Sequence, residues 1–575
     1  MERKTIKKRW RRAAMMIVLV AMALNTLTVR ADNGDAATGV NYVDAKGVLR
    51  NTQTDGIDGN DTPAVLASAD DEKTITGGWY VVKDEVTLSS NLDFEGDVHL
   101  ILADGATMTL PSLSLEEATG IEDIAVNGKG QLTIYGQTAG TGTFNSQRPL
   151  IGMEGWELTF NGGQVVIESL VVCIYILSGN VTVNGGTLSA KIIRPAPALT
   201  RTDDSYSVGM FLDFDSRLIV NGGTATFEGI EFGIIMIDGG DSRRYNAARR
   251  LTAERAKKIE DLRSITVNGG SLTATGSVGI MAQFGLTFNG GQLEAVGQTI
   301  GYHGSDIKLH WSSAADRFYI NSLQVFDDYG VSTIADGQSF VSDDETPVVI
   351  SSGDTDVPDK LAGKHMRPYG MTMQAKTATD VDGYWTTLYH GGATLDIETP
   401  DAKAYIATCD NNGETETLTL HGIGTTIPQA TGVIVLAEDS EEIRLKVNYE
   451  STETAPIGNS LCGVDKQTLT AEAMTGNNDG CKPFVLSYKE GTGMGFYEYT
   501  GDSIPAHKAF LPVSASSNTT RLLWQIDSQE TNGMSGVADR KNNSEVWFTL
   551  DGRRLAGKPT RHGLYVRNGR KEIVL

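Results

Sequence analysis

ITVNGGSLTATG (residues 265–276) places Asn-Gly-Gly between two runs in which apolar and polar residues alternate. Asn-Gly between alternating runs is typical of a tight turn between two β-strands. The motif recurs four more times, as LTFNGGQVVIES (158–169), VTVNGGTLSAK (181–191), LIVNGGTATFEG (218–229) and LTFNGGQLEAVG (286–297). The turn therefore belongs to a repeat, and the fold has to be derived from the repeat as a whole.

The repeat has a short unit that is interrupted twice. Its turn asparagines are Asn161, Asn184, Asn221, Asn268 and Asn289, at spacings of 23, 37, 47 and 21 residues. The short spacings define one unit, and the long spacings fit one unit plus an insertion. The first insertion, residues 194–206, contains Pro and polar residues, as loops do. The second, residues 242–263, has eight basic and three acidic residues without Gly or Pro, which predicts a helical excursion.

Four apolar columns run through all five repeats, three and one residues before the asparagine and four and six after it. Alternation with period two places these columns on one strand face, with Thr, Ser, Gln and Glu on the other. Separate hairpins would put Asn-Gly at every tip, whereas a β-solenoid, or parallel β-helix, would stack equivalent positions of successive units. Repetition of one residue type in one column favours a right-handed parallel β-helix. Residues 124–137 are expected to add a degenerate unit with Asn127 at the turn position.

The N-terminus is expected to be a cleaved export signal at residues 1–31. It has a basic start, the apolar run AAMMIVLVAMAL and small residues at the expected cleavage site. The alternative is a membrane anchor, but Asn25 and Thr26 interrupt the run before it reaches spanning length. Cleavage changes the formal charge from −23 to −30, and such an acidic surface excludes nucleic acid as a partner.

We expect an all-β chain with several parts. They are a polar N-terminal segment (32–74), the parallel β-helix (75–345), a polar linker (346–379), a β-sandwich-like module (380–528) and a small C-terminal β-domain (529–575). Four cysteines are too few for a disulfide framework, and a pair between Cys462 and Cys481 stays open.

Three stretches carry a resemblance to exported proteins of Bacteroidetes-type bacteria. GGWYVVKDEVTLSSNLDFEGDVHLILADGATMTL (77–110) is similar to the opening of their repeat-rich surface proteins. GYWTTLYH (383–390) with GFYEYTGDSIPAHKAFLPV (495–513) is similar to a β-sandwich-like module near their C-termini. WFTLDGRRLAGKPTRHGLYVRNGRKEIVL (547–575) resembles the C-terminal sorting domain that type IX secretion reads. The resemblance implies export and sorting machinery as partners, and an extracellular or outer-membrane surface location.

The resemblance of the β-helix to polysaccharide-lyase and adhesin solenoids calls for a test of catalytic residues. Glycoside hydrolysis needs two carboxylates, and a lyase needs a base beside a bound cation. The candidates are Asp213, Asp215 and Arg217, which alternation places on one strand face, and His303 with Lys308. Each group has a structural alternative, namely an ion-paired strand and an end cap. No zinc spacing, phosphate-binding loop or nucleophile elbow is present in the sequence, and we expect no metal or cofactor.

Two further sets of residues are binding candidates. The basic insertion offers Arg243, Arg244, Arg249, Arg250, Lys257 and Lys258 for an anionic glycan, a lipid headgroup or a partner. Its alternative is a helical loop that packs on the coil. The asparagine column is expected to be structural, with side-chain amides bonded to each other or to backbone. The sequence favours non-catalytic adhesion or glycan and host-surface binding, with a polysaccharide-active lyase or hydrolase as the alternative.

Overall fold

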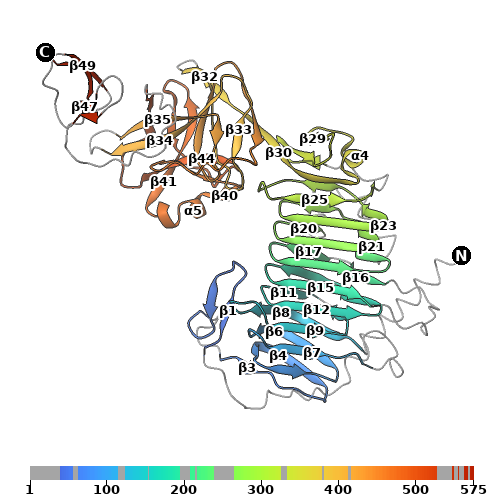
Figure 1. The fold of residues 1–575 in the computed structure, drawn as a ribbon. Coiled ribbons are helices and arrows are strands. Elements are labelled where there is room, and N and C mark those ends of the chain that lie inside the picture. Colours follow the sequence, from blue (N-terminus) through green and yellow to red (C-terminus); the bar gives the residue numbers. More distant parts are fainter. Residues whose placement is uncertain are drawn as a thin grey trace. The chain divides into compact units, whose positions relative to one another are not determined.

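The computed structural model describes residues 39–55, 62–113, 124–152, 155–193, 207–213, 216–237, 264–325, 333–378, 381–411 and 416–527, and short strands between 547 and 574. The described residues are almost entirely β, which confirms the predicted all-β class (Figure 1). It divides into two compact units, Met1–Gln525 and Ile526–Leu575. The predicted export signal and both predicted insertions, 194–206 and 242–263, lie outside the described residues. Within the described residues, no helix combines the length and apolar character that a membrane crossing requires.

A large sheet of mostly parallel strands contains the repeats (Figure 1). Its strands up to residue 334 are β3 (Ala64–Val65), β4 (Lys73–Val82), β5 (Glu85–Thr87), β6 (Leu92–Leu102), β7 (Thr107–Leu110), β8 (Val126–Gly136), β9 (Thr143–Ser146), β10 (Leu150–Gly152), β11 (Trp156–Phe160), β12 (Gln164–Ser169), β13 (Val172–Ile176), β14 (Gly179–Val183), β15 (Thr187–Ile192), β16 (Val208–Asp213), β17 (Ser216–Val220), β18 (Thr224–Glu228), β19 (Phe232–Ile237), β20 (Ile265–Val267), β21 (Ser271–Ala282), β22 (Leu286–Phe288), β23 (Gln292–Gly304), β24 (Ile307–Leu309), β25 (Arg317–Ile320), β26 (Leu323–Val325) and β27 (Thr333–Ile334).

Strand pairing joins equivalent residues of successive repeats. Before the turn, β11, β14, β17, β20, β22 and β24 pair in parallel, so that Leu158 lies beside Val181 and Leu218 beside Ile265. After the turn, β12, β15, β18, β21 and β23 do the same. Each repeat strand therefore bonds to its counterpart in the next repeat rather than across the Asn-Gly-Gly turn.

The four apolar columns form the core of this sheet. Leu158, Val181, Leu218 and Ile265 are fully buried, and so is Phe227 in a column after the turn. The polar residues between them alternate outward, as the period of two requires. Burial of each such side chain contributes about 1.5–3 kcal/mol, so the repeated columns are the main source of stability here.

The prediction that Asn127 occupies the turn position of a degenerate repeat is wrong. β8 runs unbroken from Val126 to Gly136, with Leu132 beside Leu158 and Ile134 beside Phe160. Asn127 instead pairs with Ile151 of β10, and its amide donates to Asp93 at 3.1 Å. The stretch Asn-Gly-Lys-Gly continues as an extended strand, whereas the Asn-Gly-Gly sites turn.

Strands also occupy two segments that were expected to be polar connections. Within 32–74, β1 (Asn41–Val43) and β2 (Leu49–Asn51) form an antiparallel hairpin. Within 346–379 lie β29 (Val349–Ser351), α4 (Val357–Leu361), β30 (Lys364–Gln374) and β31 (Lys376–Ala378). β30 pairs antiparallel with β25 and with β28 (Gln338–Ser342). Residues of β30 such as Met366 and Met371 are buried. The polar residues around them led to the prediction of a linker instead of a buried strand.

Two antiparallel sheets follow between residues 376 and 526. The first has the order β31-β32-β37-β34-β35-β46 and the second the order β39-β44-β41-β42-β45. Trp385 and Ile434 of the first sheet and Phe484 and Phe496 of the second share one apolar core. The elements of this region are β32 (Val381–Leu388), β33 (Leu395–Ile397), β34 (Lys403–Asn411), β35 (Glu416–Gly424), β36 (Thr426–Ile427), β37 (Val433–Ala437), β38 (Glu442–Val447), β39 (Cys462–Val464), β40 (Thr468–Leu469), α5 (Thr470–Ala473), η2 (Gly476–Asn478), β41 (Cys481–Lys489), β42 (Gly493–Glu498), β43 (Ser503–Ile504), β44 (Lys508–Ser514), β45 (Arg521–Leu522) and β46 (Trp524–Ile526). β33 and β38 extend the large sheet through β30. Cys462 and Cys481 are both free thiols.

The C-terminal unit contains a small antiparallel sheet in the order β48-β47-β49-β50. Its strands are β47 (Trp547–Phe548), β48 (Arg554–Leu555), β49 (Gly563–Arg567) and β50 (Arg570–Val574).

Candidate functional site

An apolar stripe lies on the outward side of the large sheet. It consists of Tyr175, Phe211, Ile235, Met281 and His303, which are successive partners on β13, β16, β19, β21 and β23. The residue before each one is fully buried in the core, so alternation directs the stripe away from the core. We call these five residues the outward stripe. Ile235 is only 2% exposed and packs with Val172 and Val208 in a small separate apolar cluster, against which Tyr175, Phe211 and Met281 also pack.

Tyr175 and Phe211 form an aromatic pair within the outward stripe. Their ring centroids are 5.1 Å apart and the planes meet at 72°, an edge-to-face contact. Both side chains are half-buried. Burial, and then the negative charge of Asp213, raises the pKa of the Tyr175 hydroxyl, which therefore stays protonated and able to donate a hydrogen bond. The arrangement offers ring surface and a polar tip beside a carboxylate.

The expectation that Asp213 and Arg217 share one strand face is wrong. β16 ends at Asp213 and β17 begins at Ser216, whose hydroxyl donates to the Asp213 backbone carbonyl at 2.5 Å. Arg217 donates instead to the side chain of Asn180 at 2.5 Å, and Asn180 donates to Glu157. Asp215 lies outside the described residues. Because Asp213 and Arg217 lie on different strands, the alternation of faces within one strand does not relate their side chains.

His303 and Lys308 belong to different parts of the sheet. His303 is in the outward stripe, and burial lowers the pKa of its imidazole. It lies three strands from Asp213, which is about 14 Å at ~4.8 Å per strand. Lys308 lies on β24 between Thr287 and Thr333. The described candidates Asp213, His303 and Lys308 are therefore spread over different strands of the sheet.

The five turn asparagines form a side-chain ladder. Each amide nitrogen donates at 2.8 Å to the side-chain oxygen of the asparagine in the preceding repeat, from Asn289 through Asn268, Asn221 and Asn184 to Asn161. The next position of the column is His310, whose backbone N–H donates to Phe288 as that of Asn289 donates to Val267.

The six basic residues of the second insertion that were predicted to bind a ligand cannot be compared with the structure. Arg243, Arg244, Arg249, Arg250, Lys257 and Lys258 lie outside the described residues.

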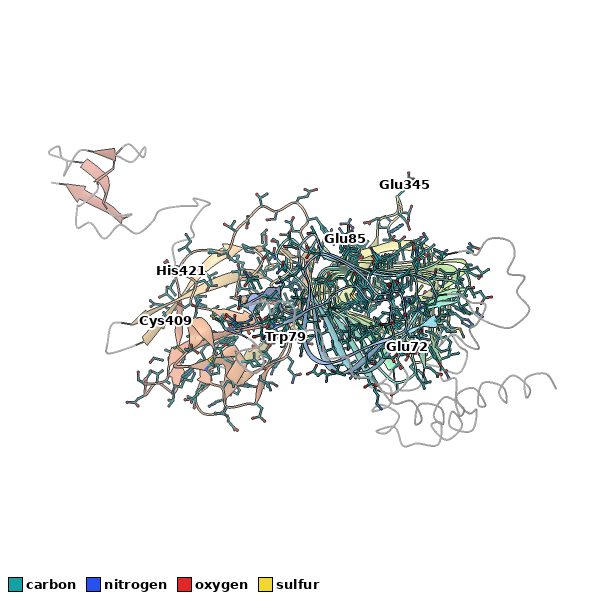
Figure 2. All side chains as sticks on the ribbon, turned by 90° about the horizontal axis from the view of Figure 1, so that it is seen from below. Glu72, Trp79, Glu85, Glu345, Cys409 and His421 are labelled. Atoms are coloured by element: carbon teal, nitrogen blue, oxygen red, sulfur yellow. The ribbon has the colours of Figure 1, made fainter. Side chains whose placement is uncertain are left out.

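A second aromatic cluster lies near the N-terminal end of the large sheet. Trp79 is labelled in Figure 2. Its ring stacks on His99, with centroids 4.5 Å apart, and on Tyr135, with centroids 5.3 Å apart. Tyr42 of the β1–β2 hairpin contacts Trp79, and Tyr42, Trp79 and Tyr135 are at most 8% exposed. The hairpin covers this cluster, which therefore packs as a small core.

Sequence reasoning missed a group of three histidines. The His390 and His507 rings are parallel within 5° with centroids 5.0 Å apart, and His310 lies 6.2 Å from His507. His390 also packs against Trp311, at 4.8 Å between centroids. Burial, and then the charges of the neighbouring His507 and His310, lower the pKa of His390 to about 3. The one indication in the sequence was His310, which follows Asn289 by one repeat unit of 21 residues and so occupies the turn-asparagine position.

Within the described residues, no group of three or more His, Cys, Asp or Glu side chains is arranged to hold a metal ion. Comparison with known proteins finds no match for this chain among family models, curated proteins or solved structures.

Proposed function

We propose that this chain is an exported surface protein that binds a glycan or another host-surface polymer through the outward stripe, without changing it chemically. In this proposal the large sheet is a parallel β-helix, the region 380–528 is a β-sandwich-like module, and the C-terminal strands serve in sorting.

Support for a β-helix comes from the strand register. Each complete repeat contributes one strand to each of three parallel ladders, for example β11, β12 and β13, then β14, β15 and β16. Parallel strands joined by such short connections must wind around a common core. The buried columns of all repeats belong to one continuous apolar cluster, as such winding requires. The apolar core shared by two antiparallel sheets supports a sandwich in the same way.

The Tyr175–Phe211 pair is the observation that carries the binding proposal. Sugar rings have an apolar face and a polar rim, and aromatic rings beside a few polar groups recognise both features. The Tyr175 hydroxyl, which stays protonated, supplies a donor beside the ring surface. The stripe continues over the neighbouring strands, at about 4.8 Å per strand, as far as His303, a length that suits an extended polymer better than a small molecule.

The separation of the acidic and basic candidates favours binding over catalysis. Asp213 and His303 lie three strands apart, and Arg217 is engaged by Asn180. The alternative, a polysaccharide lyase or glycoside hydrolase, predicts polymer cleavage that disappears in an Asp213→Asn variant.

A glycan array with the chain from residue 32 onward tests the proposal. Tyr175→Ala and Phe211→Ala should each weaken binding to the glycans found by about fivefold, since an aromatic contact contributes about 1 kcal/mol beyond its buried area. Tyr488→Ala is the matched control, because Tyr488 is a 44% exposed tyrosine on β41, outside the stripe. Equal binding by all variants would refute the role of the stripe, and cleavage lost in Asp213→Asn would establish the enzymatic alternative.

Cell fractionation of a truncated chain tests the proposed surface location. Deletion of residues 547–575, which contain β47 to β50, should leave the protein inside the cell envelope when fractions are compared. Unchanged surface exposure of the truncated chain would rule out this segment as the sorting signal.

A further inference from the structure

Three chain segments meet around the histidines, and we call them the joint. They are residues 310–314, which follow β24, residues 389–392, which follow β32, and residues 507–508 at the start of β44. The Ala314 N–H donates to the Gly392 carbonyl at 2.9 Å, and the Ser313 hydroxyl donates to the same oxygen at 3.2 Å. The Tyr389 N–H donates to the His507 carbonyl at 3.2 Å. The joint therefore connects the last repeat strands with the two antiparallel sheets.

The three imidazoles form the interior of the joint. His507 stacks on His390 and faces His310, so that the rings come from all three segments. His390 is 1% exposed, and its Nε2 has no hydrogen-bond partner among the described residues. Its Nδ1 accepts a bond from the Gly392 N–H at 3.2 Å, which requires that nitrogen to be unprotonated. The packing thus accommodates a neutral His390.

The charged groups around the joint do not offer an imidazolium a free partner. Asp316 faces His310, but its carboxylate accepts backbone N–H bonds from Gly291, Ser312 and Ser313. Asp465 faces His507, and it accepts the Gly391 N–H at 2.5 Å. Lys508 and Tyr389 belong to the joint itself, with Lys376 near Lys508 and Cys462 near Tyr389. Lys508 adds a positive charge beside His507, which disfavours a second one.

We propose that the joint is an acid-sensitive switch, closed while its three histidines are neutral and opened when they take up protons. Two imidazolium rings stacked 5.0 Å apart would repel each other. A proton on His390 Nδ1 would also break the bond from Gly392. Opening separates the rings and gives each of them water. This property is independent of the glycan-binding proposal.

The direction of the pH dependence follows from which state binds protons. Burial lowers the pKa of all three imidazoles below the ordinary 6.5, to about 3 for His390. The open joint therefore binds more protons than the closed one, and closure is fully favoured above pH ~6.5 and weakens as pH falls. Between pH 6 and pH 5, a pKa of about 3 in the closed joint and about 6.5 in the open joint makes His390 increase the opening equilibrium constant about eightfold, and His310 and His507 act in the same direction.

Hydrogen exchange of the full chain, followed by mass spectrometry, tests the switch. Peptides covering residues 310–314 and 389–392 should lose protection between about pH 6 and pH 5 after correction for the intrinsic exchange rate. His390→Gln, which cannot take up a proton, should reduce that loss about eightfold. His421→Gln is the matched control, since His421 lies on β35 and contacts Thr408 rather than the joint (Figure 2). Its acid response should equal that of the wild type.

A second variant covers the case in which His390→Gln leaves the joint open near neutral pH. His310→Asn places at this position the residue that the column has in the five preceding repeats, so it suits the local backbone. It should close normally and show a smaller acid response than the wild type, because the pKa of His310 is also lowered in the closed joint. Protection that does not change with pH, or an unaltered acid response in both joint variants, would overturn the proposal.

Discussion

A pair of glycine substitutions tests directly whether successive Asn-Gly-Gly turns stack. Gly223 and Gly140 have nearly the same left-handed backbone, with φ of +67° and +64°. A Cβ at Gly223 would lie 2.5 Å from the backbone oxygen of Gly186 in the preceding repeat, whereas one at Gly140 would meet nothing within 4 Å. Replacement by alanine therefore introduces the same backbone strain at both sites, about 1–2 kcal/mol. The close contact with the neighbouring turn arises only at Gly223.

The size of the difference follows from that contact. To accept the methyl group, the turns at Gly186 and Gly223 must move apart, which costs about 1–3 kcal/mol as overpacking does in a filled core. The Gly186 oxygen also accepts the Thr224 N–H at 2.9 Å, and weakening this bond adds about 1 kcal/mol. We expect Gly223→Ala to destabilise the sheet by about 2–4 kcal/mol more than Gly140→Ala.

Hydrogen exchange at single amides is the suitable assay, because a chain of this size need not unfold in one step. The Thr224 and Ser271 amides donate to Gly186 and Gly223, so their protection should fall in Gly223→Ala and stay near wild type in Gly140→Ala. Equal protection of these amides in both variants would refute the close stacking of the turns.

Two further substitutions probe the columns of the repeat. Phe227→Ala removes a fully buried ring and should lower the free energy of unfolding by about 3–5 kcal/mol, measured by denaturant titration of a spectroscopic signal from the sheet. An unchanged midpoint would contradict the buried position. Asn221→Ala removes two amide bonds of 2.8 Å from an exposed site and should cost about 1–2 kcal/mol, seen as a lower thermal midpoint. A loss as large as that of Phe227→Ala would mean that the amide ladder, rather than the core, holds the repeats together.

The regular parts of the sheet could be predicted because each repeat states the same pattern. Leu158, Val181 and Leu218 occupy one column of the sequence and are neighbours in the ladder. The prediction failed at Asn127, because this stretch lies outside the five aligned repeats and no other repeat could be compared with it. Asn127 is followed by Gly-Lys-Gly, and pairing with β6 and β10 keeps this stretch extended. Tertiary pairing therefore overrode a local turn signal.

The candidate site was harder to predict, because it depends on which strands become neighbours. Alternation was applied across Asp213 and Arg217 as though they shared a strand, but Ser216 begins a new one. Tyr175 and Phe211 are far apart in the chain, and their contact follows from the insertion that separates their strands while preserving the register. The three histidines are separated by about 80 and 117 residues, so no local motif announces their contact.

The asparagine column and the histidines of the joint are parts of one structural series. An asparagine amide donates and accepts, so it can bond to both neighbours in a stack, and each copy needs another copy beside it. The column must end where the repeat ends, and after His310 the next residue in the ladder is Ala335, which has no polar side chain. An imidazole at that last position can turn from the amide ladder to ring stacking, as His310 does with His507. The position that terminates a pH-insensitive ladder thus introduces the first titratable group of the column, and it joins the cluster on which acid should act.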